Sequence, residues 1–296
     1  MSETVDVNKG DVLPPIKNKR AKKKNTKQTV NFIIECLIIL VFAIVFSIAS
    51  QITYDFNRYQ KFYVNGESMY PTLNKDAKVF DTVNNKYEDV KTYLIGNFSS
   101  SGHKYLCDYG LMDNSEGFIK DVKRFSIIVT YFNEDMTLTN GNYVSKENAE
   151  LKIKRVLALP REEIYFDQFG DLFIKQEGEP SFSKIEQPFL NVSSWNEESK
   201  DFLSKAKSQT NNKSIYAYDA SHPYILKDDE YFLVGDNRME GCSHDSREVG
   251  AINSYSFVGR VVTIIGKCWY WISENGNQTE SIDWSSIIMP WRLEML

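Results

Sequence analysis

The chain has 296 residues and a mass of 34.3 kDa, which is room for one large domain or two modest ones. Its hydrophobic (42%), aromatic (14%) and charged (25%) fractions are those of a globular protein, and they exclude wholesale disorder, collagen-like repeats and a polytopic membrane protein. Residues 1–29 carry eight Lys and Arg against three acids, a charge of +5, so the overall charge of -5 leaves -10 for the remainder. This acidic remainder argues against a nucleic-acid partner.

One long apolar stretch lies near the N-terminus. From Val30 to Ala49 the sequence reads VNFIIECLIILVFAIVFSIA, with Asn31, Glu35 and Ser47 as its polar interruptions. About twenty apolar residues, at 1.5 Å each, span the core of a bilayer, so this stretch predicts one transmembrane helix. A cleaved signal peptide is the alternative, because the small residues Ser47 and Ala49 have the spacing of a cleavage site, but the length of the apolar run favours an anchor.

Basic residues crowd the segment before this stretch: Lys17, Lys19, Arg20, Lys22, Lys23, Lys24 and Lys27. Under the positive-inside rule such a flank keeps the N-terminus cytoplasmic. The sequence therefore predicts a basic cytoplasmic tail (1–29), a single-pass anchor in the cytoplasmic membrane (30–52) and an extracytoplasmic domain (53–296). The lipid bilayer is the first expected partner.

Short apolar and aromatic stretches follow the anchor, and their lengths and β-branched residues predict strands. They are KFYV (61–64), FSIIVTYF (125–132), KIKRVLAL (152–159), DLFIK (171–175), YFLVGD (231–236) and VGRVVTIIG (258–266). Two insertions are expected between the strand blocks, at about residues 83–120 and 180–222. The first carries Gly, Ser and Asn clusters, and the second contains a predicted helix over residues 193–207. The expected fold class is mainly β.

The first chemical motif, SMYPTL, begins at Ser68, just after the strand predicted at residues 61–64. It resembles the S-M-x-P-T-L motif of bacterial type I signal peptidases, in which the serine is the nucleophile. Gly66 and Pro71 bracket Ser68 in a turn of restricted backbone that could hold a hydroxyl at the edge of a cleft. The alternative is a turn serine that only hydrogen-bonds its own backbone.

The second motif, IKRVLALP at residues 153–160, resembles the I-K-R-V-I-G-L-P-G-D of the same family, whose lysine is the general base. A lysine can deprotonate a serine only when burial lowers its pKa from about 10.4 toward 7 or 8. Lys154 has the apolar neighbours that this requires, although a surface lysine paired with an acid is the alternative. The family's Gly-Asp is replaced here by Arg161-Glu162, so the turn after the proline differs.

The third motif comprises GDNR at residues 235–238 and SHDSR at residues 243–247, and it resembles the family's G-D-N-R-x-x-S-x-D-S-R-x-x-G with two extra residues between its halves. The resemblance implies that Ser243 orients the lysine amine, and that Asp245 and Arg247 form a supporting salt bridge. An ordinary polar turn would also suit this composition.

The oxyanion that forms during acyl transfer requires hydrogen-bond donors. Some members of the family carry a serine hydroxyl where this chain has Gly66, so backbone N–H groups, including that of Ser68, remain as donors. Gly66 would also permit close approach of a substrate backbone.

Other patterns are weaker. Three S-x-x-K matches, at Ser101, Ser181 and Ser204, have no K-T-G partner. Zinc ligands at His103/Cys107 or Cys242/His244 lack a repeated pair spacing, so no metal is expected. Endoplasmic-reticulum relatives of the family use histidine as the base, but the lysine in the second motif favours the bacterial type over a role for His244.

The three motifs together predict a membrane-anchored Ser/Lys endopeptidase that removes N-terminal signal peptides from exported preproteins, cutting after small residues. The resemblance implies an antiparallel β catalytic body that needs no cofactor, with signal peptides as partners and no nucleic acid. The alternative is a non-catalytic membrane-anchored scaffold that binds signal peptides or a protein partner on the same fold. A self-cleaving repressor-type protease would share the chemistry, but it would need a DNA-binding domain in place of the anchor.

Overall fold

The computed structural model describes residues 19–81, 84–88, 103–167, 171–190, 219–238, 242–272 and 278–287. The chain divides into two compact units, Met1–Phe56 and Asn57–Leu296. The helix predicted over residues 193–207 lies outside the described residues.

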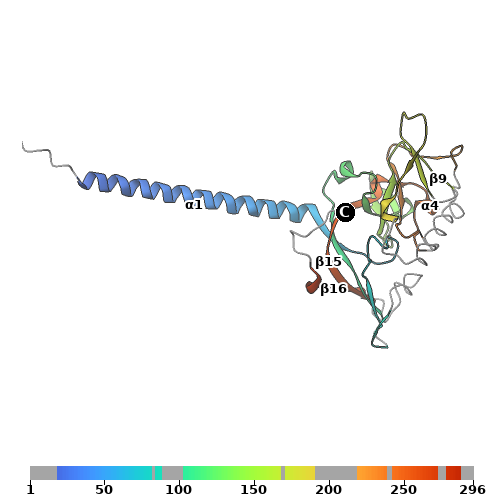
Figure 1. Cartoon of the computed structure of the whole chain (residues 1–296), viewed down its shortest axis with the longest axis horizontal. Helices are drawn as coiled ribbons and strands as arrows, with labels where there is room; N and C mark the ends of the chain where they lie inside the picture. Colours follow the sequence, from blue (N-terminus) through green and yellow to red (C-terminus); the bar gives the residue numbers. More distant parts are fainter. Residues whose placement is uncertain are drawn as a thin grey trace, which may run out of the picture. The chain divides into compact units, whose positions relative to one another are not determined.

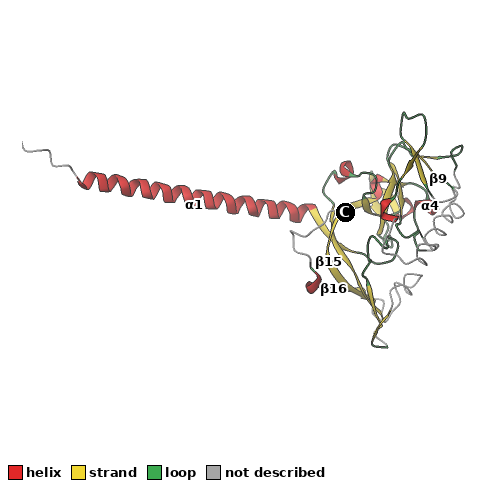
Figure 2. Ribbon diagram, in the orientation of Figure 1, coloured by secondary structure: helices red, strands yellow, loops and turns green. Residues whose placement is uncertain are grey.

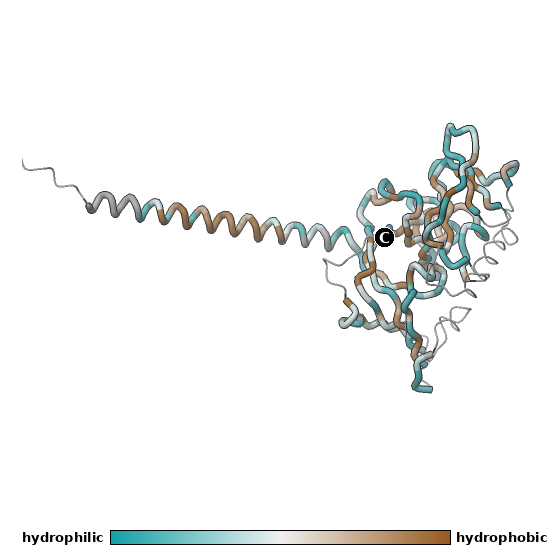
Figure 3. The backbone as a smooth tube through the Cα atoms, in the orientation of Figure 1, coloured by the Kyte–Doolittle hydropathy of each residue, from teal (hydrophilic) through white to brown (hydrophobic). Residues whose placement is uncertain are grey.

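The first unit is dominated by one long helix, α1 (Lys19–Arg58), whose sequence contains neither glycine nor proline. Within it, Lys27–Gln51 has a mean hydropathy of 3.0 and is long and apolar enough to cross a membrane. Figure 3 shows this apolar band along the helix. Large apolar side chains on all sides of the band are exposed, Phe46 by 75%, as expected of a helix whose apolar surface is not matched to a protein core. The predicted apolar helix is confirmed.

The second unit is mainly antiparallel β structure (Figures 1 and 2). In the described part of the chain ten strands form one sheet, ordered β14-β13-β8-β5-β15-β4-β2-β3, with β1 also paired to β4 and β16 to β15. Their bounds are β1 (Tyr59–Tyr63), β2 (Lys78–Asp81), β3 (Lys86–Glu88), β4 (His103–Asp113), β5 (Ile127–Thr130), β8 (Lys152–Ala158), β13 (Glu230–Val234), β14 (Ile252–Asn253), β15 (Phe257–Ile272) and β16 (Gln278–Asp283).

The longest strand, β15, joins the two halves of this sheet. Its first residues pair with β5, and Arg260–Trp271 pair with β4. Register shifts interrupt the β15 ladder at three places between Phe257 and Gly266, and such irregularities bend a strand and increase its twist. The strand can therefore pair with β5 at one end and with β16 at the other.

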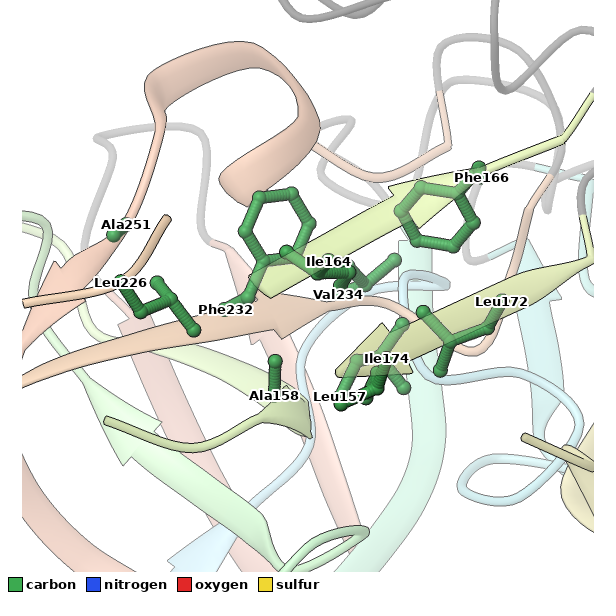
Figure 4. Close-up of a cluster of buried hydrophobic side chains, with 10 residues drawn as sticks. All are labelled: Leu157, Ala158, Ile164, Phe166, Leu172, Ile174, Leu226, Phe232, Val234 and Ala251. Carbon is green, nitrogen blue, oxygen red and sulfur yellow. The ribbon is translucent and has the colours of Figure 1, made fainter. Parts of the chain in front are cut away.

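A smaller sheet, ordered β11-β10-β9-β12, packs against part of the main sheet. Alternate side chains of β9 and β10 are buried, and they join residues of β8 and β13 in a ten-residue apolar cluster (Figure 4). A two-stranded hairpin, β6-β7, is separate. The remaining elements are β6 (Met136–Thr139), β7 (Asn142–Ser145), β9 (Glu163–Phe166), β10 (Leu172–Lys175), β11 (Ser183–Ile185), β12 (Tyr224–Ile225), α4 (Ser246–Val249) and 3-10 turns η1 (Phe118–Asp121), η2 (Asn133–Asp135), η3 (Pro188–Leu190), η4 (Ser254–Ser256) and η5 (Trp284–Ser286).

The mainly β fold class is confirmed, and each of the six predicted strand segments overlaps a strand of the structure. The insertion expected at residues 83–120 is wrong in part, because it contains β4, which lies between β15 and β2 in the main sheet. The Gly, Ser and Asn clusters that indicated a loop, at residues 96–102 and 114–117, flank this strand in the sequence. Most of the insertion expected at residues 180–222 lies outside the described residues.

Candidate active site

Ser68 lies in a compact loop that follows β1. The side chain of Asn74 closes this loop, because its Nδ2 donates to the carbonyl oxygens of Val64 and Gly66 at 2.9 Å each. Asn74 is fully buried and has a left-handed backbone (φ 63), a conformation that asparagine tolerates better than most residues. Its backbone N donates to Asp108 Oδ2 at 2.6 Å, which fastens the loop to β4.

Gly66 has φ 121, in the region that favours glycine. A Cβ at this position would meet nothing within 4 Å. Backbone conformation, and not crowding, therefore accounts for the glycine two residues before Ser68.

Lys154 lies on β8, opposite Ile128 of β5, and is 3% exposed. Its Nζ donates to Ser68 Oγ at 2.9 Å and to the carbonyl oxygen of Ile153 at 3.0 Å. Burial lowers the pKa of Lys154 from 10.5 to about 8, although the nearby Asp245 carboxylate acts in the opposite direction. A buried amine of this pKa beside a hydroxyl has the geometry and the basicity to accept a proton from it.

The turn of residues 235–238 holds the backbone of the Ser68 loop. The backbone N of Asn237 donates to the carbonyl oxygen of Ser68 at 3.0 Å, and its Nδ2 donates to that of Glu67 at 3.1 Å. Gly235 packs so closely here that an added Cβ would lie 2.5 Å from the Ser68 carbonyl oxygen and 2.2 Å from Ser243 Oγ. The third motif therefore holds the Ser68 loop by the backbone carbonyl oxygens of Glu67 and Ser68.

Asp245 organises the second half of the third motif. Arg247 donates to both of its carboxylate oxygens at 2.8 Å, and Ser243 Oγ and the backbone N of Gly235 donate to Oδ2 at 2.6 and 2.9 Å. Burial alone would raise the pKa of Asp245, but Arg247 and these hydrogen bonds outweigh it and hold the pKa at about 2. Asp245 also accepts from the backbone N of Arg247 as the N-cap of α4, so it fixes the loop as a charged, buried centre.

The structure brings Ser68 and Lys154 into contact and places Ser243, Asp245 and Arg247 in one hydrogen-bonded group beside them. Within the described residues, the hydrogen bonds of Lys154 Nζ go to Ser68 and Ile153, and Ser243 donates to Asp245. The orientation of the lysine amine by Ser243 stays a prediction.

A second buried ion pair, which the sequence did not predict, links all three motifs. Arg155 donates to Asp236 through Nε at 2.8 Å and Nη2 at 2.6 Å, and Thr72 Oγ1 donates to the same carboxylate. Asp236 is fully buried. Thr72, Arg155 and Asp236 each lie within one of the three motifs, but only the three-dimensional structure shows that they bind one another.

In the altered turn after β8, the carboxylate of Glu162 still makes hydrogen bonds within the turn. Arg161 has φ 65, in the left-handed region where glycine is favoured. Glu162 accepts the backbone N of Leu159 at 2.8 Å and a bidentate pair of bonds from Arg124 at 2.9 and 2.6 Å. Glu162 thus closes the turn even though Arg161 replaces the glycine.

Metal ligation has no support in this region. Across the described ranges, no group of three or more His, Cys, Asp or Glu side chains could hold a metal ion. His244 contacts Glu248 through Nδ1 and packs edge-on against Phe132, so it is turned to partners other than Ser68.

The family model described as "Signal peptidase, peptidase S26" matches residues 31–268. The chain belongs to the S26 signal peptidase family. No curated protein matches it. Among solved structures, the crystal structure of a signal peptidase I from Enterococcus faecalis V583 is similar, with 21% identity and a TM-score of 0.29 over 47% of this chain and 95% of that chain. All three motifs of this S26 signal peptidase family chain lie within the matched residues.

Proposed function

We propose that this chain is a membrane-anchored serine endopeptidase that removes N-terminal signal peptides from exported preproteins. The observation that carries the proposal is the 2.9 Å hydrogen bond between Lys154 Nζ and Ser68 Oγ, made by a buried amine with a pKa of about 8 in a chain of the S26 family. At pH 7 to 8 a substantial fraction of such an amine is neutral and able to act as a base.

Acylation begins when Ser68 Oγ attacks the scissile carbonyl carbon and Lys154 Nζ takes the hydroxyl proton. The tetrahedral intermediate collapses as Lys154 returns that proton to the leaving amine, which breaks the peptide bond and leaves an ester on Ser68. Water then attacks the ester with the neutral lysine as its base, releasing the signal peptide as a carboxylic acid. No step requires a cofactor.

The oxyanion that forms in both steps needs a donor. We assign the backbone N–H of Ser68, which makes no hydrogen bond within the described residues. Gly66, with open space at its Cβ position, leaves room for the substrate backbone to approach this N–H.

The apolar band of α1 would anchor the enzyme, with residues 1–29 in the cytoplasm, 30–52 in the cytoplasmic membrane and 53–296 on the extracytoplasmic side. The basic flank of the helix supports this orientation. Signal peptides are themselves apolar and membrane-bound, so an anchored enzyme meets them at the bilayer. By family resemblance, cleavage follows small residues at the first and third positions before the cut.

The decisive experiment is cleavage of a purified preprotein by the full-length chain in detergent, beside Ser68→Ala and Lys154→Ala. We expect the parent to cut after a small residue and both variants to lose at least about a thousandfold in kcat, with circular dichroism unchanged. Lys152→Ala, two residues from the base and on the same strand, is the matched control and should lose no more than about tenfold, because its charge is a lesser cause than burial of the lowered pKa of Lys154.

A non-catalytic scaffold predicts a different result. In that case the parent would bind a signal peptide, measured by fluorescence anisotropy, without cutting it, and the alanine variants would bind equally well. Variants that cut as fast as the parent would contradict the assignment of Ser68 and Lys154.

A further inference from the structure

A buried guanidinium lies behind the turn of residues 235–238. Arg238 is 2% exposed, and burial lowers its pKa to about 9, so it stays charged at neutral pH. Its Nε donates to the carbonyl oxygen of Gly235 at 2.9 Å and its Nη2 to Gln187 Oε1 at 2.7 Å, while its Nη1 is buried and has no acceptor among the described residues. A buried charge with so few partners is sensitive to the loss of any one of them.

The neighbouring carboxylates are bonded to other arginines. Asp236 is paired with Arg155 and Asp245 with Arg247. Among the described residues, the amide of Gln187 is therefore the side chain that holds the Arg238 guanidinium.

Gln187 is itself held firmly. It is 8% exposed, and its backbone carbonyl oxygen accepts a hydrogen bond from the backbone N of Leu190 at 3.0 Å, which forms η3. Just before it, Ile185 pairs with Leu172 of β10 and packs on the ten-residue apolar cluster of Figure 4. The smaller sheet thus provides a fixed support for the amide.

Arg238 transmits that support to the Ser68 loop. Its bond to the Gly235 carbonyl closes the turn of residues 235–238 from within. The same turn donates from Asn237 N to the Ser68 carbonyl oxygen, and Gly235 packs against that oxygen. A shift of the turn would therefore displace Ser68 relative to Lys154.

We propose that Gln187 is a positioning residue for the Ser68 and Lys154 chemistry, acting through Arg238 and the turn of residues 235–238 on the backbone of Ser68. The role rests on the proposed peptidase function. Gln187 contacts neither Ser68 nor Lys154 by any hydrogen bond of the described residues, so its effect is on geometry alone.

The test compares Gln187→Ala and Gln187→Glu with two controls in the full-length chain. Glu186→Ala changes an exposed neighbour, and Leu190→Ala removes a buried apolar side chain from the same 3-10 turn. Four quantities are measured: kcat and KM on a synthetic signal peptide, the thermal midpoint, and the hydrogen-exchange rate of the Asn237 backbone amide that donates to Ser68.

We expect Gln187→Ala to lower kcat by on the order of 10- to 100-fold with KM almost unchanged, and to speed exchange of the Asn237 amide. Gln187→Glu restores both, because a carboxylate accepts from Arg238 at least as well as an amide. Leu190→Ala lowers the thermal midpoint but keeps the parent kcat and exchange rate. Glu186→Ala keeps the thermal midpoint, kcat and exchange rate of the parent.

Parent-like kcat in Gln187→Ala would overturn the proposal, and so would a loss of kcat in Leu190→Ala as large as that in Gln187→Ala. A parent chain that cuts no signal peptide would instead contradict the proposed function. The exchange measurement still decides the positioning role in that case, because unchanged protection of the Asn237 amide in Gln187→Ala would refute it.

Discussion

The backbone N of Asn237 donates to the carbonyl oxygen of Ser68 across 3.0 Å. The proposed nucleophile is therefore held through its own main chain by a turn from a distant motif. Side-chain truncation cannot remove this bond, but a change in the backbone path of the turn can, and this directs the first prediction.

Gly235→Ala is expected to lower kcat by about 100-fold. The added Cβ would lie 2.5 Å from the Ser68 carbonyl oxygen and 2.2 Å from Ser243 Oγ, so either the turn or the Ser68 loop must move. Gly141→Ala is the control, because its φ of 83 strains an alanine while its surroundings are open. Steady-state cleavage kinetics of the two variants provide the check, and equal kcat values would contradict the prediction.

The pH dependence of cleavage should report the lysine base. Because burial lowers the pKa of Lys154 to about 8, kcat/KM is expected to rise tenfold per pH unit below about pH 8 and to level off above it. A profile of kcat/KM from pH 6 to pH 10 measures this limb. A limb near pH 6.5, the ordinary range of histidine, would point to a different base.

The buried lysine should also cost stability at neutral pH. The unfolded chain binds a proton at Lys154 up to pH 10.5 but the folded chain only up to about pH 8, so the free energy of unfolding rises with pH between these values. Below pH 8 the full penalty, about 3 kcal/mol, is present. Lys154→Met should therefore be more stable than the parent at pH 7, with the advantage shrinking toward pH 10.5.

Urea unfolding of the parent and Lys154→Met at pH 7 and pH 10 measures that difference. Lys152→Met, which changes a partly exposed lysine on the same strand, should show a much smaller dependence on pH, because Lys152 is a lesser cause than burial of the lowered pKa of Lys154. A Lys154→Met chain no more stable than the parent at pH 7 would contradict the predicted penalty.

Glu162→Gln should destabilise the chain by about 2 to 3 kcal/mol. The substitution leaves the Arg124 guanidinium, whose side chain is 16% exposed, without a carboxylate and weakens the bond to the Leu159 N–H. Glu150→Gln, in an exposed pair with Lys152, should cost less than about 1 kcal/mol. Unfolding midpoints in urea compare the two, and equal losses would show that Glu162 does not close the turn.

Much of the fold could be predicted because local pattern and tertiary environment agree. The segments KIKRVLAL and YFLVGD have strand lengths and β-branched or aromatic residues, and both form strands. The strand β4 was missed because turn-forming residues flank it in the sequence and because its pairing with β15 is a long-range contact. The pattern of apolar residues along the sequence does not predict such a contact.

The candidate site was predictable only where residue type dictates chemistry. Ser68 and Lys154 could be proposed from the sequence because each lies in a family motif whose serine is the nucleophile or whose lysine is the base. Asn74 and Gln187 were not found, because an asparagine in a turn and a glutamine between short elements are common. What distinguishes them is burial and a partner far away in the sequence, Asp108 of β4 for Asn74 and Arg238 of the turn after β13 for Gln187.

The separation of these contacts along the chain also bears on how the chain folds. The Ser68–Lys154 bond joins residues 86 positions apart, and the Asn237–Glu67 bond joins residues 170 positions apart. Contacts of such high sequence separation slow folding and require much of the sheet to be in place first. During refolding, peptide cleavage should therefore return after the far-ultraviolet dichroism does. The recovery of activity would then report the formation of the last long-range contacts.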